Sequence, residues 1–178
     1  TSNWDIVVFK CNSSGVLQWQ RALQGSDYDN GSSIASDSSG NVYVSASTRS
    51  GGAGGAELLL AKYNSSGVIQ WQKLLGGTGN EYPGGIAVDS SANVYLAGFT
   101  YSNFNSQSGD ILASKWDSSG NLLWQRTFGG TKELPSQYQP VDVANAVAVD
   151  NSGNFYFAGY TDSSHPSGIR EVLVTRLP

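Results

Sequence analysis

The sequence predicts an all-β protein built from a unit of short strands that recurs along the chain. The first observation is a repeated phrase, SGVLQWQ at 14–20, SGVIQWQ at 66–72 and SGNLLWQ at 119–125. The second is the spacing of its tryptophans, which lie 52 and then 53 residues apart. The third is that the apolar runs are short, are bounded by Gly, Ser and Asn, and lack the periodicity of a helix.

Each unit divides into four runs, which we name strands A to D. Around the middle of the chain, 85–88 fits strand A, 93–100 fits B, 58–63 fits C and 68–75 fits D. The run proposed for strand A, GGIAVD, is rich in small residues, which suit strands that crowd around a central axis. Four strands in a unit of about 40–50 residues are typical of a β-propeller blade.

This register predicts that the chain both opens and closes on strand C, at 5–11 and at 171–177. We therefore expect about three four-stranded antiparallel blades plus one extra strand, in a single repeat domain that spans 1–178. The expected units are 1–25 (partial), 26–77, 78–130 and 131–178 (partial).

Three blades are too few for a ring, because known propellers have about 4–8 blades. We expect the ring to be completed by another chain or by a longer polypeptide. In one arrangement two copies meet head to tail, and the strands near 144–177 of one copy are completed by 16–23 of the other. In the other arrangement a longer chain or a larger particle supplies the missing blades.

The order of the turn residues resembles a known family. The stretch GGTGNEYPGGIAVDSSANVYLAGFT, at 76–100, is similar to the bacterial β-propeller repeat often called the SBBP repeat. The first unit departs from the pattern, with Ser-Ala-Ser at 45–47 where Ala-Gly-Phe stands at 97–99. Similar arrays occur in virion proteins of phages that infect marine cyanobacteria. The resemblance implies a binding or structural scaffold in a virion or an extracellular assembly, and it carries no catalytic residues.

The connections between strands predict two different faces. The A–B and C–D turns are nearly constant and read DSSGN or NSSG, whereas the B–C and D–A loops vary in length and composition. Binding residues often lie on variable loops held by a rigid scaffold. The alternative is that these are ordinary solvated loops. The candidate binding residues on the variable face are Tyr28, Tyr82, Tyr101, Phe104, Tyr138 and His165.

The repeated tryptophans are predicted to be structural. Trp19, Trp71 and Trp124 hold the same place in every unit, so we expect them to pack between neighbouring blades. Sugar stacking is the alternative role for these indoles. Cys11, the single cysteine, aligns with Tyr63 of the next unit and is expected at an apolar packing position.

No catalytic or metal site emerges from the ionisable residues. Asp5, Glu57, Asp110 and Glu171 recur at the start of strand C, which favours a repeated salt bridge or turn cap over the two distinguished carboxylates of a glycosidase. The single histidine, His165, has no evident partners for a catalytic triad. Each DSSGN turn holds one acid, too few for a calcium loop. The sequence therefore predicts no enzyme activity, no cofactor and no metal.

The charge and the apolar content of the sequence exclude some classes of partner. Only 13% of the residues are charged, about half of the usual fraction of ~25%. The net charge of −4 argues against nucleic acid, since phosphate binding needs a basic surface. No apolar run reaches the length of about 18 residues that a membrane span needs, so no membrane insertion is expected.

Three functions remain as hypotheses. The first is a non-catalytic β-propeller used for structure or attachment in a virion or on an extracellular surface, with other protein chains as partners, this chain itself among them. The second is a lectin-like module that binds surface glycans through the variable loops. The third, a propeller hydrolase, is disfavoured by the absence of a distinguished acid–base set.

Overall fold

The computed structural model describes residues 4–23, 25, 27–50, 55–101, 109–129 and 142–161, together with the backbone of 171–177. These residues form thirteen strands and no helix, which confirms the all-β fold class. The strands are β1 (Ile6–Cys11), β2 (Leu17–Leu23), β3 (Asp29–Ser36), β4 (Val42–Thr48), β5 (Glu57–Tyr63), β6 (Ile69–Leu75), β7 (Glu81–Val88), β8 (Val94–Thr100), β9 (Asp110–Trp116), β10 (Leu122–Phe128), β11 (Val143–Val149), β12 (Phe155–Thr161) and β13 (Glu171–Leu177). None of the described segments is a helix that would be long and apolar enough to cross a membrane.

Antiparallel pairing groups these strands into four sheets. The second sheet (β3 to β6) and the third sheet (β7 to β10) each hold four strands in chain order, as a propeller blade does. The first sheet contains β1 and β2 alone, and the fourth contains β11, β12 and β13. The described strands thus form two complete blades that lie between two partial ones. The sequence predicted about three blades plus one extra strand, which is the same number of strands in total.

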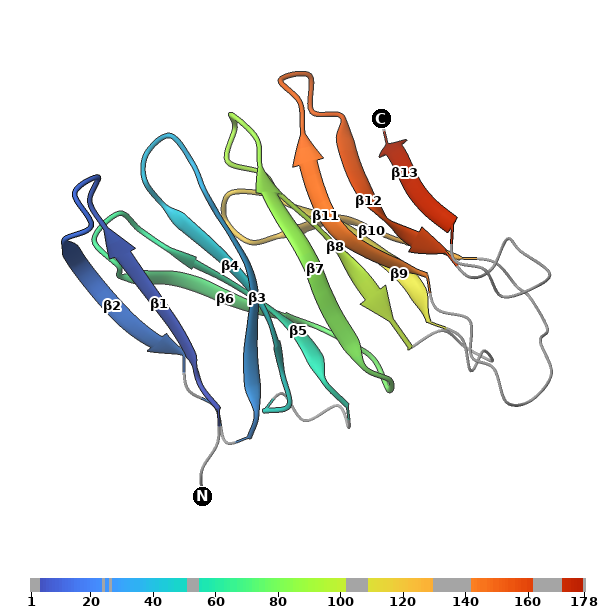
Figure 1. Ribbon diagram of the computed structural model, residues 1–178, viewed down its shortest axis with the longest axis horizontal. Coiled ribbons are helices and arrows are strands. Elements are labelled where there is room, and N and C mark those ends of the chain that lie inside the picture. The colour runs from blue at the N-terminus through green and yellow to red at the C-terminus, as the bar shows by residue number, and fades with distance from the viewer. Residues whose placement is uncertain are drawn as a thin grey trace.

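The four sheets lie side by side in chain order and do not close a ring (Figure 1). The first sheet stands at one end of the row and the fourth at the other. The A–B turns lie along one edge of the row, and the N-terminus lies at the opposite edge. We call the edge with the A–B turns the turn face and the opposite edge the loop face.

The turns of the turn face are held by one acceptor residue each. In the β3–β4 turn, Asp37 Oδ1 accepts the backbone amides of Ser39 and Asn41, both at 2.9 Å. The turn then needs a residue with positive φ, and Gly40 supplies it at +75°. Ala92 holds the same position in the third sheet at +62°, which is a strained conformation for alanine.

The apolar core lies between successive sheets. Each sheet contributes alternate side chains of its strands to one neighbour and the intervening side chains to the other neighbour, as the two-residue period of a strand dictates. Between the second and third sheets, for example, Tyr43 and Leu60 pack against Leu96 and Trp116. Similar clusters join the first sheet to the second and the third to the fourth.

Candidate binding face

A repeated hydrogen bond underlies the loop face. In three sheets a buried acid at the start of strand A accepts a hydrogen bond from a threonine at the end of strand B, 19 residues later. The pairs are Asp29 with Thr48, Glu81 with Thr100, and Asp142 with Thr161. Sequence reasoning missed these pairs, although their constant separation was a usable signal. Each pair ties strands A and B together below the variable loops.

The acids at the start of strand C lie beside the same loops. A Cβ on Gly76, at the end of β6, would come within 2.8 Å of Glu57 Cγ and 2.9 Å of Glu81 Oε2. The backbone amide of Gly77 donates to Glu81 Oε2 at 3.1 Å. Among the described residues, no three His, Cys, Asp or Glu side chains gather in a way that would hold a metal ion. The lack of a side chain at Gly76 therefore leaves space for the side chains of Glu57 and Glu81 beside the loop.

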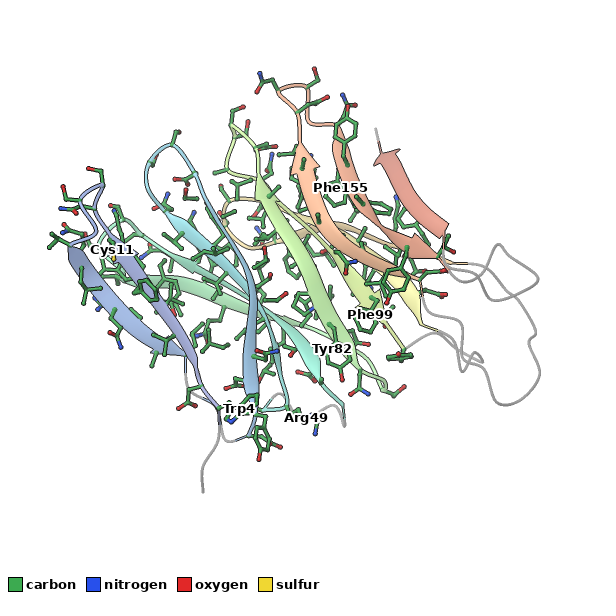
Figure 2. All side chains as sticks on the ribbon, viewed as in Figure 1. Trp4, Cys11, Arg49, Tyr82, Phe99 and Phe155 are labelled. Atoms are coloured by element: carbon green, nitrogen blue, oxygen red, sulfur yellow. The ribbon has the colours of Figure 1, made fainter. Side chains whose placement is uncertain are left out.

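An aromatic cluster stands at the loop end of the third sheet. Tyr82 on β7 stacks on Phe99 of β8 with ring centroids 5.0 Å apart, and Figure 2 shows both near the loop edge. Tyr101 meets Phe99 edge to face at 5.7 Å. Burial raises the pKa of Tyr101, and the nearby hydroxyls of Tyr82 and of Tyr160 from the fourth sheet raise it further. All four rings are half-buried, so each keeps part of its surface open.

This cluster is specific to one part of the chain. Tyr82 and Phe99 are cross-strand partners, and they form the pair directly next to Glu81 and Thr100 on the two strands. The same places in the second sheet hold Asn30 and Ser47, which also pair across the two strands. Because the second sheet forms without aromatic residues there, the fold does not require them. A cluster that varies between otherwise equal sheets is the kind of feature expected of a binding site.

A second aromatic pair lies at the loop end of the first two sheets. Trp4 and Tyr28 meet edge to face at 6.1 Å, and both rings are exposed. The backbone carbonyl of Trp4 accepts a hydrogen bond from the backbone amide of Asp29 at 2.9 Å. The backbone carbonyl of Tyr28 accepts one from the backbone amide of Arg49 at 3.2 Å. Figure 2 shows Trp4 and Arg49 at the same edge of the molecule. Sequence reasoning named Tyr28 but missed Trp4, which belongs to no repeated phrase.

The described structure thus places three of the predicted binding residues on the loop face. Tyr82 and Tyr101 lie in one cluster, and Tyr28 lies apart with Trp4. The other three predicted residues lie outside the described part of the chain: Phe104, Tyr138 and His165.

A cavity of about 290 Å³ opens between the first and second sheets. Its lining includes Leu23, Asp29, Thr48, Leu59 and Gln72. This volume lies at the lower end of the roughly 300–1,000 Å³ of small-molecule sites. The Asp29–Thr48 pair and Gln72 supply its polar groups, and the leucines supply its apolar wall.

The repeated tryptophans join consecutive sheets. Trp19 Nε1 donates to the carbonyl of Ser65 in the C–D turn of the second sheet, at 3.0 Å. Trp71 Nε1 donates in the same way to Ser118 in the third sheet, at 3.2 Å. Trp124 packs against Phe155 of the fourth sheet, with ring centroids 6.1 Å apart. All three indoles therefore contact the following sheet.

The repeated lysines reach the same turns. Lys10 Nζ donates to the carbonyl of Ser65 at 3.3 Å, and Lys62 Nζ donates to that of Ser118 at 2.9 Å. Lys62 also lies over the ring of Tyr43, 5.2 Å from its centroid. The repeated lysine of strand C, like the tryptophan of strand D, thus binds the turn of the next sheet.

Two stretches of the chain match the family model of the β-propeller repeat. The matches to this repeat, abbreviated SBBP, cover residues 18–52 and 70–105. Each begins in strand D of one sheet and runs through strands A and B of the next. The tryptophans at 19 and 71 and the acid–threonine pairs of the second and third sheets therefore all lie within the matched repeats.

A curated protein from Caulobacter vibrioides, named "Regulatory protein FlaEY", is similar to this chain. It is 27% identical over 128 residues, which cover 65% of this chain and 13% of the Caulobacter protein. The chain thus matches a small part of a much longer relative.

Proposed function

We propose that this chain is a non-catalytic β-propeller scaffold, used for structure or attachment in a virion or an extracellular surface assembly. The observation that carries the proposal is the identical use of the buried acids in three sheets. Catalytic carboxylate pairs need two different environments, so that one group is an acid while the other is ionised. In this chain each buried acid accepts a hydrogen bond from a threonine in the same place of its sheet, which holds for Asp29, Glu81 and Asp142.

The division between constant and variable parts supports the same proposal. The tryptophans and lysines that join the sheets recur, whereas the aromatic groups of the loop face do not. A framework that is rigid and repeated, with a variable face on one side, is how many binding scaffolds present a surface to a partner.

Location and activity test the proposal separately. Immunogold labelling of the particles or cells that produce the protein should place it on an outer surface, and labelling confined to the interior would contradict this. A hydrolase screen should find no turnover with the purified chain. Turnover that Glu81→Gln abolishes, while Asp5→Asn retains it, would show that the carboxylates are catalytic and would refute the scaffold proposal.

A second candidate function is glycan binding by the third sheet. The observation that favours it is the half-buried cluster of Tyr82, Phe99 and Tyr101. Aromatic faces with a polar edge suit sugars, which offer apolar C–H faces and hydroxyl groups. Titration with surface polysaccharides should then show binding that Tyr82→Ala weakens. Tyr28→Ala, in the separate Trp4 pair, is the matched control and should have little effect. The glycan proposal fails if both variants bind as wild type does or if millimolar sugar gives no signal.

A further inference from the structure

We propose that the cavity between the first and second sheets binds a primary alkylamine, with the ammonium group on the carboxylate of Asp29 and the alkyl chain among leucines. The proposal depends neither on the scaffold function nor on the glycan site of the third sheet. Both sheets contribute side chains to the site. They are Leu23 of β2, Asp29 of β3, Thr48 of β4, Leu59 of β5, and Gln72 and Leu74 of β6.

The carboxylate of Asp29 is buried, but only one of its two oxygens has a partner. Asp29 lines the cavity and is 5% exposed, and its Oδ1 accepts a hydrogen bond from Thr48 Oγ1. Among the residues that the structure describes, no donor reaches Oδ2 and no cation pairs with the carboxylate. A buried carboxylate oxygen without a donor is costly, so a ligand that donates to it from the cavity would be stabilised.

The equivalent acid of the third sheet uses both of its oxygens. Glu81 is longer than Asp29 by one methylene group. Its Oε1 accepts a hydrogen bond from Thr100 Oγ1 at 2.9 Å, and its Oε2 accepts one from the backbone amide of Gly77 at 3.1 Å. Gly25 holds the place of Gly77, and its Cβ position lies 2.6 Å from Asp29 Oδ2, yet no hydrogen bond joins the two residues. The shorter acid therefore leaves an acceptor unused at the first junction.

The walls of the cavity are mostly apolar. Leu23 is buried in the first inter-sheet core, and Leu59 packs against that core. Leu74 is 48% exposed, and Gln72 lies on the same side of β6 because the two residues are two positions apart. The space of about 290 Å³ thus combines one buried carboxylate oxygen with three leucine side chains. It suits a ligand with one strong donor group and an apolar body.

A primary alkylamine fits these groups better than the other classes of small ligand do. Its ammonium group donates hydrogen bonds and keeps its positive charge near neutral pH, as that of lysine does. A sugar would place several hydroxyl groups against the leucines, where they would lack partners. An anion would meet the carboxylate of Asp29, and no lysine or arginine is among the described lining residues. A metal ion needs several ligands, and the described residues gather no such set.

A second hollow continues the site along the outer strands β2 and β6. Its volume is about 560 Å³, and it shares Leu23 and Gln72 with the cavity. The rest of its lining is mostly apolar and includes Ala22, Tyr63, Val68 and Ile69. An alkyl chain that is longer than the cavity therefore has an apolar surface on which to continue. Each methylene group that it buries there should strengthen binding by up to about fourfold.

Titration of the folded chain with simple amines, followed by the chemical shifts of its backbone amides, tests the site. Butylamine should bind saturably at millimolar concentration and shift the signals of Asp29, Thr48 and Gln72. Hexylamine should bind more tightly. Butanol and butyrate, which carry the same chain without a cation, should bind at least about tenfold more weakly. Equal binding of butanol, or no saturable shift with any amine, would overturn the proposal.

A free amine and the lysine side chain of a protein partner carry the same ammonium group. Nα-acetyl-lysine methylamide, added in the same titration, distinguishes these two sources. Binding at least as tight as that of butylamine would show that the mouth of the cavity admits a polypeptide backbone, and would assign the site to a partner's lysine. Weaker binding of the lysine derivative would assign the site to free amines.

Asp29→Glu tests the unused oxygen by copying the acid of the third sheet. The longer side chain should reach the backbone amide of Gly25, as Glu81 reaches that of Gly77, and should keep a hydrogen bond with Thr48. The variant should therefore be at least as stable in urea as the wild type, but it should bind butylamine at least about tenfold more weakly. Unchanged binding by the folded variant would overturn the assignment of the ammonium group to Oδ2.

Asp29→Asn tests the charge without a change in length. It should weaken the binding of butylamine at least about tenfold and leave the weak binding of butanol unchanged. Asp27→Asn is the matched control, because it removes a carboxylate two residues away that does not line the cavity. This control should bind butylamine as the wild type does. An equal loss in both variants would mean that the general charge of the loop face attracts the amine, and it would refute a site at Asp29.

Discussion

Trp19 lies against Gly67 in the turn of the following sheet, so closely that a Cβ on Gly67 would come within 2.7 Å of the indole. The Nε1 of Trp19 donates to Ser65 in the same turn at 3.0 Å. Trp19 and Gly67 belong to successive copies of the phrase SGVxQWQ, and Ser65 directly precedes the second copy. The phrase therefore recurs because each copy is complementary to its neighbour.

The first prediction compares two glycines in equivalent turns. Gly67→Ala should destabilise the chain by about 1–3 kcal/mol more than Gly15→Ala, because the added methyl group collides with Trp19. Both glycines have φ near +75°, at +74° and +78°, so the strain of a left-handed alanine is common to both variants. Unfolding in urea measures the difference. Equal loss in the two variants would mean that the indole does not cover the turn.

The second prediction compares a buried and an exposed tryptophan. Trp19 is 9% exposed and packs in the first inter-sheet core, whereas Trp4 is 68% exposed on the loop face. Trp19→Ala should lower the free energy of unfolding by about 3–5 kcal/mol. Trp4→Ala should change it by less than about 1 kcal/mol. Chemical denaturation of both variants decides the point, and similar midpoints would contradict the assignment of Trp19 to the core.

The number and approximate positions of the strands were predictable because local sequence patterns indicate where strands begin and end. Apolar runs bounded by Asn, Ser and Gly mark the strand ends, and the repeat spacing fixes how many strands form. The acid at the start of each turn, such as Asp37, is also a local signal, since it accepts amides only two and four residues away.

Contacts between distant segments were not predictable in this way. Trp19 and Ser65 are 46 residues apart, and their contact depends on how two sheets stack. Similarly, Tyr82 and Phe99 meet because they pair across β7 and β8. In the sequence they are two separate aromatic residues, each near small residues, and nothing local indicates that they are in contact. A residue pair that recurs at a constant separation, such as Glu81 and Thr100, would have revealed some of the contacts between strands A and B.

The third prediction concerns the strained alanine in the β7–β8 turn. Gly40 and Gly153 have φ of +75° and +79°, where Ala92 has +62°. A left-handed alanine costs roughly 1–2 kcal/mol, and glycine loses about 0.5–1 kcal/mol through its unfolded-state entropy. Ala92→Gly should therefore stabilise the chain by up to about 1.5 kcal/mol. Ala87→Gly, within β7, is the control and should destabilise it; a loss of stability in Ala92→Gly would show that the turn is not strained.

The fourth prediction is a loss of stability in acid that depends on Asp150. The side-chain amide of Asn154 is the main cause that lowers the pKa of Asp150 from 3.8 to about 2, with further hydrogen bonds from the Asn154 and Ser152 amides and the Tyr156 hydroxyl. Because the folded pKa is below the unfolded one, this stabilisation is complete above pH 3.8 and is lost as the pH falls to about 2. Denaturation midpoints measured across that range should fall.

Asp150→Asn is the matched variant for this pH dependence. In the C–D turns Asn12 and Asn64 each accept hydrogen bonds from the backbone amides two and four residues later, as Asp150 does in its own turn. Asparagine is therefore compatible with this turn. The variant should be less stable than the wild type near neutral pH and should lose less stability between pH 3.8 and about 2. Equal acid sensitivity in both proteins would show that this carboxylate does not contribute to it.

The last prediction concerns the bond between Glu81 and Thr100, which lies directly beneath the aromatic cluster. Thr100 Oγ1 donates to Glu81 Oε1 at 2.9 Å, and both residues are buried. Thr100→Val keeps the shape of the side chain but removes this donor from a buried carboxylate, which should cost about 1–3 kcal/mol. Thr100→Ser keeps a hydroxyl at the same place and should restore much of the loss. Because Tyr82 and Phe99 are the next residues along the two strands, Thr100→Val should also change their near-ultraviolet circular dichroism, whereas Thr48→Val in the second sheet should leave it unchanged. Equal stability of the valine and serine variants would show that the hydroxyl is not what holds strands A and B together beneath this site.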